Sequence, residues 1–338
     1  MSRRVLAVRQ DNNGDVILAG PPIRAIAASG ARVTLLCGPR GEAAARLLPC
    51  VERVEVFEAA WIDAHPRPVE SREIAAFVAR IRAEEFEEAI IFTSFHQSPL
   101  PMALLLRLAG ISRVGAISDD YPGSLLDVRH RVSNAIHEVT RGLSLAHAMG
   151  YELPADDDGT LMLRAIPPMP IAAGESYVVV HPGCTVPARR WSPENNAGLV
   201  RELDARGHRV YVTGSPDERA LTAYVAGGHG IDLGGRTSLA EFASLVGGAR
   251  AVICGNTVAS HVASAMRTPV VCIFAPTVPA VRFRPWRVAH VLLGDQRAPC
   301  AGCRARICPV EGQPCLGDVT PQSVVAALER LLCGAAAA

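Results

Sequence analysis

Short apolar runs alternate with longer stretches in which apolar residues recur at helical spacing along most of the chain. The short runs are typical of buried strands, and the longer stretches are typical of amphipathic helices. In the first half, the predicted strands are 5–8, 33–37, 54–57, 89–93 and 114–117, and the predicted helices are 16–29, 41–48, 72–84, 100–109 and 134–149. Regular alternation with short connections predicts an α/β fold built on a parallel, doubly wound sheet.

A segment rich in proline and alanine, 166–174, interrupts this alternation. Because proline and glycine break both kinds of element, we predict an N-terminal lobe over 1–165, a linker over 166–174, a C-terminal lobe over 175–320, and a final helix and tail over 321–338. The second lobe repeats the alternation, with strands at 177–181, 209–213, 231–233, 251–254 and 269–274, and helices at 193–206, 216–225, 239–247 and from 257. Two such lobes predict a cleft in which each lobe binds one of two substrates.

Size and charge narrow the class of protein. The chain has 338 residues, enough for two domains. Its formal net charge is +1, from 34 basic and 33 acidic residues, which argues against a nucleic-acid binder. No apolar run approaches the roughly 20 residues that span a membrane. The apolar run after Met1 is too short for a signal peptide, so we expect a cytoplasmic protein.

Asp15 is the candidate for general acid–base chemistry. It follows the first predicted strand and falls at the start of a helix, where a carboxylate stabilises the helix N-terminus. The same position lies at the carboxyl end of the strand, facing the predicted cleft, where a carboxylate can accept a proton from a hydroxyl group. The pattern by itself favours the helix-stabilising role. Asp11 is a weaker candidate for the same chemistry.

Three segments of the second lobe are candidates for phosphate and ribose binding. Thr185 and Arg189 lie in a basic loop after strand 177–181, where an arginine can neutralise a phosphate. Glu218 follows strand 209–213, at a position suited to a ribose diol. The turn Asn256-Thr257-Val258 leads into a helix that carries His261, and the free N–H groups of a helix start can bind a phosphate. The alternative for the Arg189 segment is an exposed basic loop before a capped helix, and the alternative for the other two segments is an ordinary capped helix.

The remaining candidates are acceptor-binding and metal-binding residues. His96 and Gln97 end strand 89–93, and Asp120 follows strand 114–117, so all three can contact an acceptor. Cys300, Cys303, Cys308 and Cys315 have the spacing C-x2-C-x4-C-x6-C in a loop rich in proline and glycine. A zinc or iron–sulfur site there is an open alternative, but the second pair is not spaced as in common zinc ribbons, so we expect reduced thiols and no metal.

Taken together, these segments resemble the ADP-heptose heptosyltransferase family, family 9 of the glycosyltransferases. The resemblance covers nearly the whole chain. Its motifs are Asn-Asn-Gly14-Asp15-Val, His181-Pro-Gly, Arg189-Arg-Trp191, Gly214-Ser-Pro-Asp-Glu218, Asn256-Thr-x-x-Ser-His261 and Phe274-Ala-Pro-Thr277, followed by the cysteine loop. The sequence departs from the family pattern at two places: Asn256-Thr257-Val258 replaces the usual Asp-Thr-Gly, and Arg189 replaces a lysine.

The resemblance implies a GT-B fold, with the acceptor on the N-terminal lobe and the nucleotide sugar on the C-terminal lobe. It implies a metal-independent, inverting transfer that needs no cofactor beyond the nucleotide sugar, expected to be ADP-heptose. In this reading Asp15 is the base, Arg189 contacts the donor phosphate, Glu218 binds the ribose, and Thr257, Val258 and His261 receive the diphosphate.

The acceptor is not readable from the sequence. A lipid-linked or lipopolysaccharide-core sugar and a soluble glycoside both stay open, and a lipid-linked acceptor would imply association with a membrane surface. Two alternatives to a transferase also stay open: a nucleotide-sugar epimerase or hydrolase of the same fold, and a non-catalytic nucleotide-sugar-binding subunit. The presence of Asp15 together with the phosphate-side residues favours an enzyme.

Overall fold

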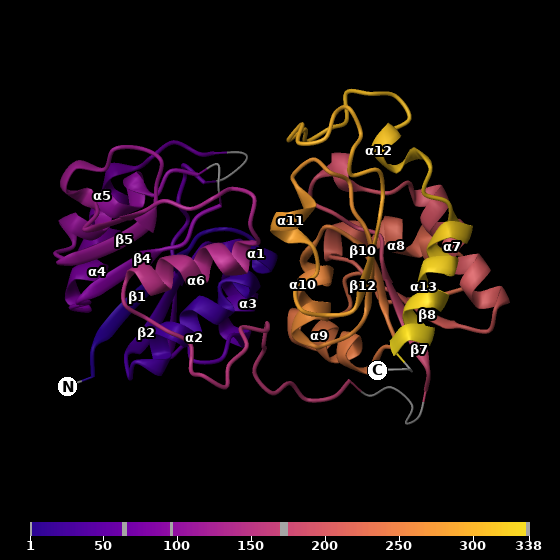
Figure 1. The fold of residues 1–338 in the computed structure, drawn as a ribbon, viewed down its shortest axis with the longest axis horizontal. Coiled ribbons are helices and arrows are strands. Elements are labelled where there is room, and N and C mark those ends of the chain that lie inside the picture. Colours follow the sequence, from indigo (N-terminus) through magenta and orange to yellow (C-terminus); the bar gives the residue numbers. More distant parts are fainter. Residues whose placement is uncertain (1, 63–65, 95–96, 170–174, 336–338) are drawn as a thin grey trace. The chain divides into compact units, whose positions relative to one another are not determined.

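The computed structural model describes residues 2–62, 66–94, 97–169 and 175–335. The chain forms two compact units, and the boundary in the sequence lies between Arg164 and Ala165 (Figure 1). The elements of the first unit alternate as the sequence predicts. They are β1 (Arg4–Arg9), α1 (Asn13–Leu18), α2 (Gly20–Ala28), β2 (Arg32–Cys37), α3 (Glu42–Leu47), β3 (Arg53–Val56), α4 (Ser71–Ala83), β4 (Glu88–Ile91), α5 (Leu100–Leu108), β5 (Arg113–Ile117), β6 (Val128–His130) and α6 (Glu138–Ala148).

The six strands of the first unit form one parallel sheet in the order β3-β2-β1-β4-β5-β6. This order reverses between β1 and β4, which pair with Val8 opposite Ile91. In a doubly wound sheet, ligands bind outside the carboxyl ends of the strands at such a reversal. The loops after β1 and β4 are therefore the part of this unit in which a functional site is expected.

Apolar residues at alternate positions of the strands face the helices on the two sides of the sheet. Leu6 and Val8 of β1 pack with Phe77 of α4 and Leu106 of α5 in one buried cluster. On the other side, α6 packs against α2 so closely that a Cβ at Gly142 would lie 2.9 Å from Pro22 Cγ. Strands buried on both faces read as continuous apolar runs, which explains why the sequence pattern located them.

The prediction of one helix over 16–29 is wrong, because the structure has two helices, α1 and α2, in this region. The first ends at Leu18 with Ala19 as its C-cap, and the second begins at Gly20. Pro21 and Pro22 stand at the start of α2, where proline is tolerated because the first N–H groups of a helix have no intrahelical acceptor. Inside one continuous helix the same prolines would remove hydrogen bonds.

The second unit has the same arrangement of strands. Its sheet is parallel, with the order β12-β11-β10-β7-β8-β9, so the reversal lies between β7 and β10. Its elements are β7 (Tyr177–His181), α7 (Pro193–Ala205), β8 (Arg209–Val212), α8 (Arg219–Ala226), β9 (Ile231–Asp232), α9 (Leu239–Gly248), β10 (Val252–Gly255), α10 (Val258–Ala265), β11 (Val270–Ile273), α11 (Ala280–Phe283), β12 (His290–Leu293), α12 (Pro314–Gly317) and α13 (Pro321–Ala335).

Helices α7, α8 and α13 cover one face of this second sheet. Leu203 of α7 and Leu328 of α13 pack against Val180 of β7 and Val212 of β8 in one buried cluster. Helices α9 and α10 lie on the opposite side of the strands (Figure 1). None of the helices among residues 2–62, 66–94, 97–169 and 175–335 has both the length and the apolar character needed to cross a bilayer.

Candidate functional site

In the first unit, polar side chains gather at the carboxyl ends of β1 and β4, where the strand order reverses. Arg9 is the last residue of β1, and Asp15 lies in the first turn of α1. Ser94 follows β4 and is buried. Because β1 and β4 are neighbours in the sheet, these side chains meet although they are 85 residues apart in sequence: Arg9 Nη2 donates to Ser94 Oγ at 3.2 Å.

Arg9 lies at the centre of this group, and its side chain is 5% exposed. Its three nitrogens each face a different carboxylate: Nη2 lies 3.1 Å from Asp15 Oδ1, Nε lies 2.9 Å from Asp11 Oδ2, and Nη1 lies 4.0 Å from Glu138 Oε2. The contact of Nε with Asp11 is an ion pair whose N–H is not aligned for a hydrogen bond. The guanidinium is therefore fixed in orientation by surrounding negative charge.

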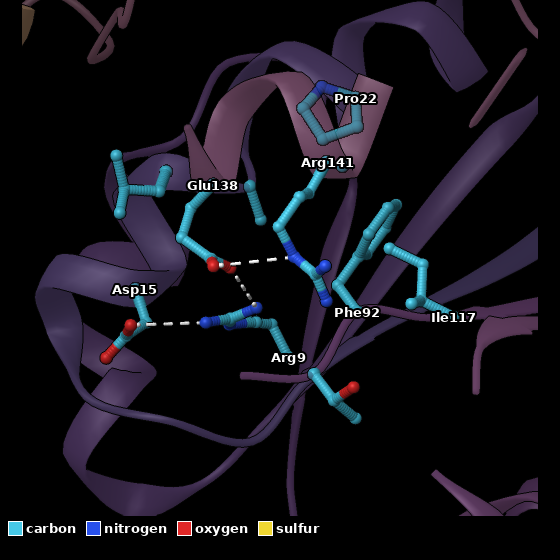
Figure 2. A pocket seen from close by; sticks show the side chains of 11 residues that line it. Arg9, Asp15, Pro22, Phe92, Ile117, Glu138 and Arg141 are labelled. Carbon is cyan, nitrogen blue, oxygen red and sulfur yellow. Dashed lines mark hydrogen bonds and ion pairs between the residues drawn. The ribbon is translucent and has the colours of Figure 1, made fainter. Parts of the chain in front are cut away.

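Figure 2 shows the pocket beside these residues, with Arg9 joined by ion pairs to both Asp15 and Glu138. Its polar lining is Arg9, Asp15, Thr93, Glu138 and Arg141, and its apolar lining includes Phe92 and Ile117. The side chain of Asp15 is 21% exposed, whereas those of Asp11 and Glu138 are 8% and 3% exposed. Asp15 is thus the most accessible of the three carboxylates that surround Arg9.

Helix α6 contributes a second buried arginine, Arg141, whose Nε lies 3.5 Å from Glu138 Oε1. Its Nη1 donates to Asn134 Oδ1 at 3.1 Å. Burial and the positive charge of Arg9 lower the pKa of Arg141. Glu138 lies between the two guanidinium groups and offsets part of their mutual repulsion.

The acceptor candidates from the sequence are placed differently from one another. Gln97 Nε2 donates to Asp11 Oδ1 at 2.7 Å, so Gln97 joins the group around Arg9. Asp120 is exposed, and its Oδ2 accepts a hydrogen bond from Ser98 Oγ at 3.3 Å. Among the described residues, no contact links Asp120 to Asp15. His96 lies outside the described residues.

In the second unit, the loops after β7 and β10 also meet at a reversal of strand order. Helix α10 begins there at Val258, and its N-cap is Thr257, whose Oγ1 accepts from Ala259 N at 3.2 Å. Asn256 is buried just before this cap, and Val258 is half-buried. The N-terminus of α10 therefore points its backbone N–H groups out of the carboxyl edge of the sheet, the geometry that binds phosphate in related folds.

His261 stands one turn into α10 and is 4% exposed. Its Nδ1 is buried and has no hydrogen-bond partner within the described part of the chain. Burial lowers the pKa of His261 to about 4. The imidazole is therefore neutral near pH 7, and any contact that it makes with a ligand is a hydrogen bond between neutral imidazole and ligand rather than an ion pair.

Arg189 reaches the same edge of the second sheet from the loop after β7. It ends a 3₁₀ turn, Pro187–Arg189, and its Nε donates to Thr277 Oγ1 at 3.0 Å. Thr277 is buried and follows β11, so two loops that are distant in sequence hold the arginine in place. Thr185, in the same loop as Arg189, is exposed.

Glu218 follows β8 and has a structural role that the sequence pattern also indicates. Its Oε2 accepts from Ser215 N at 2.9 Å and from Ser215 Oγ at 3.0 Å, in a capping box at the start of the 3₁₀ turn Pro216–Glu218, which precedes α8. Glu218 also lies beside the loop after β7, since a Cβ at Gly183 would fall 2.2 Å from Oε1. His181 is close by: burial lowers its pKa, and the negative charge of Glu218 opposes that shift.

The four cysteines of the late loop line one pocket together with Ala188 and Thr277. Cys315 is buried, and burial together with the neighbouring thiols raises its pKa. Across the ranges that the structure describes, however, no group of three or more histidine, cysteine or acidic side chains is arranged to hold a metal ion. The loop is tied to the Arg189 segment by hydrogen bonds from Ala188 N to Arg306 O at 2.9 Å and from Gln313 Nε2 to Ala188 O at 2.8 Å.

Sequence reasoning located Asp15 but missed Arg9, Glu138, Arg141 and the partnership of Arg189 with Thr277. Arg9 had one available signal, because it is a charged residue directly after the apolar run of β1. Glu138 and Arg141 are spaced i,i+3 and therefore share a face of α6. Their direction toward β1 depends on how α6 packs, which no local pattern contains.

Known proteins share their family and their fold with this chain. Residues 74–313 match the profile of a family described as glycosyltransferase family 9 (heptosyltransferase). Lipopolysaccharide heptosyltransferase 1 of Pseudomonas aeruginosa is 30% identical over 258 residues, which cover 70% of this chain and 72% of that protein. Lipopolysaccharide heptosyltransferase 3 of Escherichia coli is 26% identical over 168 residues, 47% of this chain, and that match spans only 48% of the relative's length.

A solved structure with the same fold is an Escherichia coli heptosyltransferase with ADP-2-deoxy-2-fluoro heptose. Its TM-score is 0.72 at 21% identity, over 97% of this chain and 99% of that chain. At this identity the likeness shows the fold, which is GT-B: two α/β lobes, each with a parallel six-stranded sheet.

Proposed function

The chain belongs to glycosyltransferase family 9, and with that premise we propose that it transfers heptose from ADP-heptose to an acceptor hydroxyl, with Asp15 as general base. The observation that carries the proposal is the position of Asp15 at the strand reversal of the first unit. One carboxylate oxygen, Oδ1, is held by Arg9, while the side chain keeps 21% of its surface exposed. A base needs this combination of a fixed orientation and an accessible oxygen.

The proposed donor site lies on the second unit. The diphosphate of ADP-heptose binds at the N-terminus of α10, where backbone N–H groups and the neutral His261 donate hydrogen bonds. Arg189 adds a positive charge, and Glu218 accepts hydrogen bonds from the ribose hydroxyls through Oε1. The donor of the solved heptosyltransferase structure, an ADP-linked fluoroheptose, supports the choice of nucleotide.

The proposed reaction is a single displacement that inverts the anomeric centre. The acceptor oxygen attacks the anomeric carbon, the bond from that carbon to the diphosphate oxygen breaks, and the acceptor proton passes to Asp15. Arg189 and the N–H groups of α10 stabilise the negative charge on the departing ADP. Because these groups supply the stabilising charge, the proposal requires no metal, and transfer should persist in EDTA.

The acceptor that we propose is a sugar of the lipopolysaccharide core. The relatives from Pseudomonas aeruginosa and Escherichia coli are lipopolysaccharide heptosyltransferases, which supports this class of acceptor. Acceptor contacts are proposed for Gln97 and Asp120, since the first joins the group around Arg9 and the second is exposed in the same unit.

The experiment is to supply ADP-heptose and lipopolysaccharide that lacks heptose, and to measure ADP release and the mass of the product. The wild-type protein should add one heptose, and Asp15→Asn should abolish transfer while it leaves calorimetric binding of ADP intact. Asp204→Asn, at an exposed ion pair with His229, is the matched control. Full transfer by a folded Asp15→Asn protein would refute the role of Asp15 as the general base. If the wild type binds ADP but transfers no heptose, the non-catalytic alternative is favoured.

The donor assignment has its own test. Calorimetric titrations with ADP, GDP and UDP should show selectivity for ADP, and Arg189→Ala and Glu218→Ala should weaken ADP binding. Arg206→Ala is the control, because Arg206 forms exposed ion pairs with Glu202 and Glu329 in the same unit. Selectivity for GDP or UDP would be consistent with a glycosyltransferase but would contradict the proposal that the donor is an ADP-linked sugar.

A further inference from the structure

We infer that Arg9 is a positioning residue for the transfer reaction, which acts by holding the carboxylate of Asp15 in the orientation that proton acceptance requires. The inference rests on the function proposed above, because it assigns Asp15 as the base. It concerns a residue that no sequence motif singled out, buried behind the base and at the end of β1.

Arg9 contacts Asp15 through one oxygen only. Nη2 of Arg9 lies 3.1 Å from Oδ1 of Asp15 (Figure 2). Among the described residues, Oδ2 of Asp15 has no hydrogen bond or ion pair. One oxygen is therefore anchored, and the other is available to an acceptor hydroxyl, which fixes the direction from which the proton arrives.

Three separate parts of the first unit determine the position of Arg9. Asp11 precedes α1, Ser94 follows β4, and Glu138 begins α6, and each of them contacts the Arg9 guanidinium. Asp11 is held in turn by Gln97 Nε2 at 2.7 Å. A planar guanidinium can meet partners in several directions at once, whereas an ammonium is a point charge that cannot replace all of these contacts.

Arg9 also balances the charge around the base. Asp11, Asp15 and Glu138 bring three carboxylates to one guanidinium, and Arg141 contacts only Glu138 among them. Without Arg9, the three carboxylates would lose the positive charge that they share. Mutual repulsion would then push Asp15, the most exposed of the three, away from the position in which Arg9 holds it.

The test compares Arg9→Ala with Arg24→Ala in the transfer assay with ADP-heptose and heptose-deficient lipopolysaccharide. Arg24 is a matched control because it is also buried and ion-paired in the first unit, with Asp157 at 2.6 Å. Arg9→Ala should lower kcat by about 100-fold, as expected when a reacting group is misplaced by about 1 Å. ADP affinity should stay unchanged, since the proposed donor residues lie on the second unit.

Two further measurements separate positioning from simple loss of structure. Millimolar guanidinium should restore part of the kcat of Arg9→Ala, because it can refill the vacated position, and should not change the kcat of Arg24→Ala or Asp15→Asn. Arg9→Lys should retain more activity than Arg9→Ala but less than the wild type.

The outcomes also distinguish this inference from the proposed function. A folded Arg9→Ala protein with wild-type kcat, or a loss that guanidinium does not reverse, would overturn the positioning role while leaving Asp15 as the base. If Asp15→Asn transfers heptose normally, or if the wild type transfers none, the proposed function and the role of Arg9 both fail.

Discussion

Gly183 and Glu218 are in such close contact that a Cβ at position 183 would lie 2.2 Å from the Oε1 atom of the glutamate. The two residues follow β7 and β8, neighbouring strands of the second sheet. The absence of a side chain at Gly183 therefore lets the carboxylate lie against the loop that carries Arg189. This contact links the position of Glu218, the proposed ribose-binding residue, to that of Arg189, the proposed phosphate-binding residue.

Gly183→Ala should displace Glu218, because the new methyl group occupies the space of the carboxylate. We expect ADP affinity to fall by about tenfold, the equivalent of about 1.4 kcal/mol, in calorimetric titrations. Gly198→Ala in α7 is the control, since its Cβ would come no closer than 3.3 Å to Pro321 Cγ. Unchanged ADP affinity in Gly183→Ala would show that the position of Glu218 does not matter for the nucleotide.

Thr277→Val tests how Arg189 is held. The substitution keeps the shape of the buried side chain and removes the hydroxyl that accepts from Arg189 Nε. A hydrogen bond of this kind contributes about 1 kcal/mol, so ADP affinity should fall roughly fivefold. The matched control is Thr268→Val, which removes the hydroxyl that donates to Val246 O elsewhere in this unit. Equal effects of the two variants on ADP binding would argue against a specific role for Thr277.

His261 should make the protein less stable as the pH falls. Its pKa is lowered by burial to about 4, from an ordinary value of 6.5, so the unfolded chain takes up the proton first. The stability that depends on neutral His261 is complete above pH 6.5 and is lost as the pH falls toward 4. A shift of this size corresponds to about 3 kcal/mol.

The measurement is Tm at pH 7.5, 6 and 5 for the wild type and for His261→Asn. The variant should be less stable at pH 7.5, because a well-packed side chain is lost, and its Tm should then fall less steeply with acid than that of the wild type. His181 remains in both proteins and contributes in the same direction, so the comparison isolates His261. If Tm falls equally steeply with pH in His261→Asn and in the wild type, the conclusion that His261 is a buried neutral imidazole is contradicted.

Thiol reactivity should distinguish three buried cysteines from three exposed ones among the ten free cysteines. Burial raises the pKa of Cys37 and Cys272 to about 12 and raises that of Cys254 as well, so these three thiols should resist alkylation at pH 8. Cys50, Cys303 and Cys333 are exposed and should react first. Mass spectrometry after a timed pulse of iodoacetamide measures the order, and early labelling of Cys37, Cys254 or Cys272 in native protein would disagree with the fold.

The sequence located most elements because their signals are local. The strands β1, β2, β4, β7 and β10 are apolar on both faces and stand out as continuous runs. The predictions missed β6 and β12, which lie at the edges of their sheets. An edge strand has one paired neighbour and less burial, and the residues of β12 are all half-buried. β6 has one apolar residue among its three, Val128, and so carries little of the apolar signal, whereas β12 was missed although it contains Val291, Leu292 and Leu293.

The family motifs placed Asp15, Arg189, Glu218 and His261 at strand ends and helix starts, because turn, cap and strand-end residues lie close together in sequence. What surrounds each of them was decided only by the tertiary structure. Arg9 meets Glu138 because α6 packs against α2 and the strands β5 and β6, and Arg189 meets Thr277 because two loops leave one edge of a parallel sheet. Local sequence encodes which residues can do the chemistry. Contacts between distant segments, set by the packing of helices on the sheets, determine which charges and hydrogen bonds hold those residues in place.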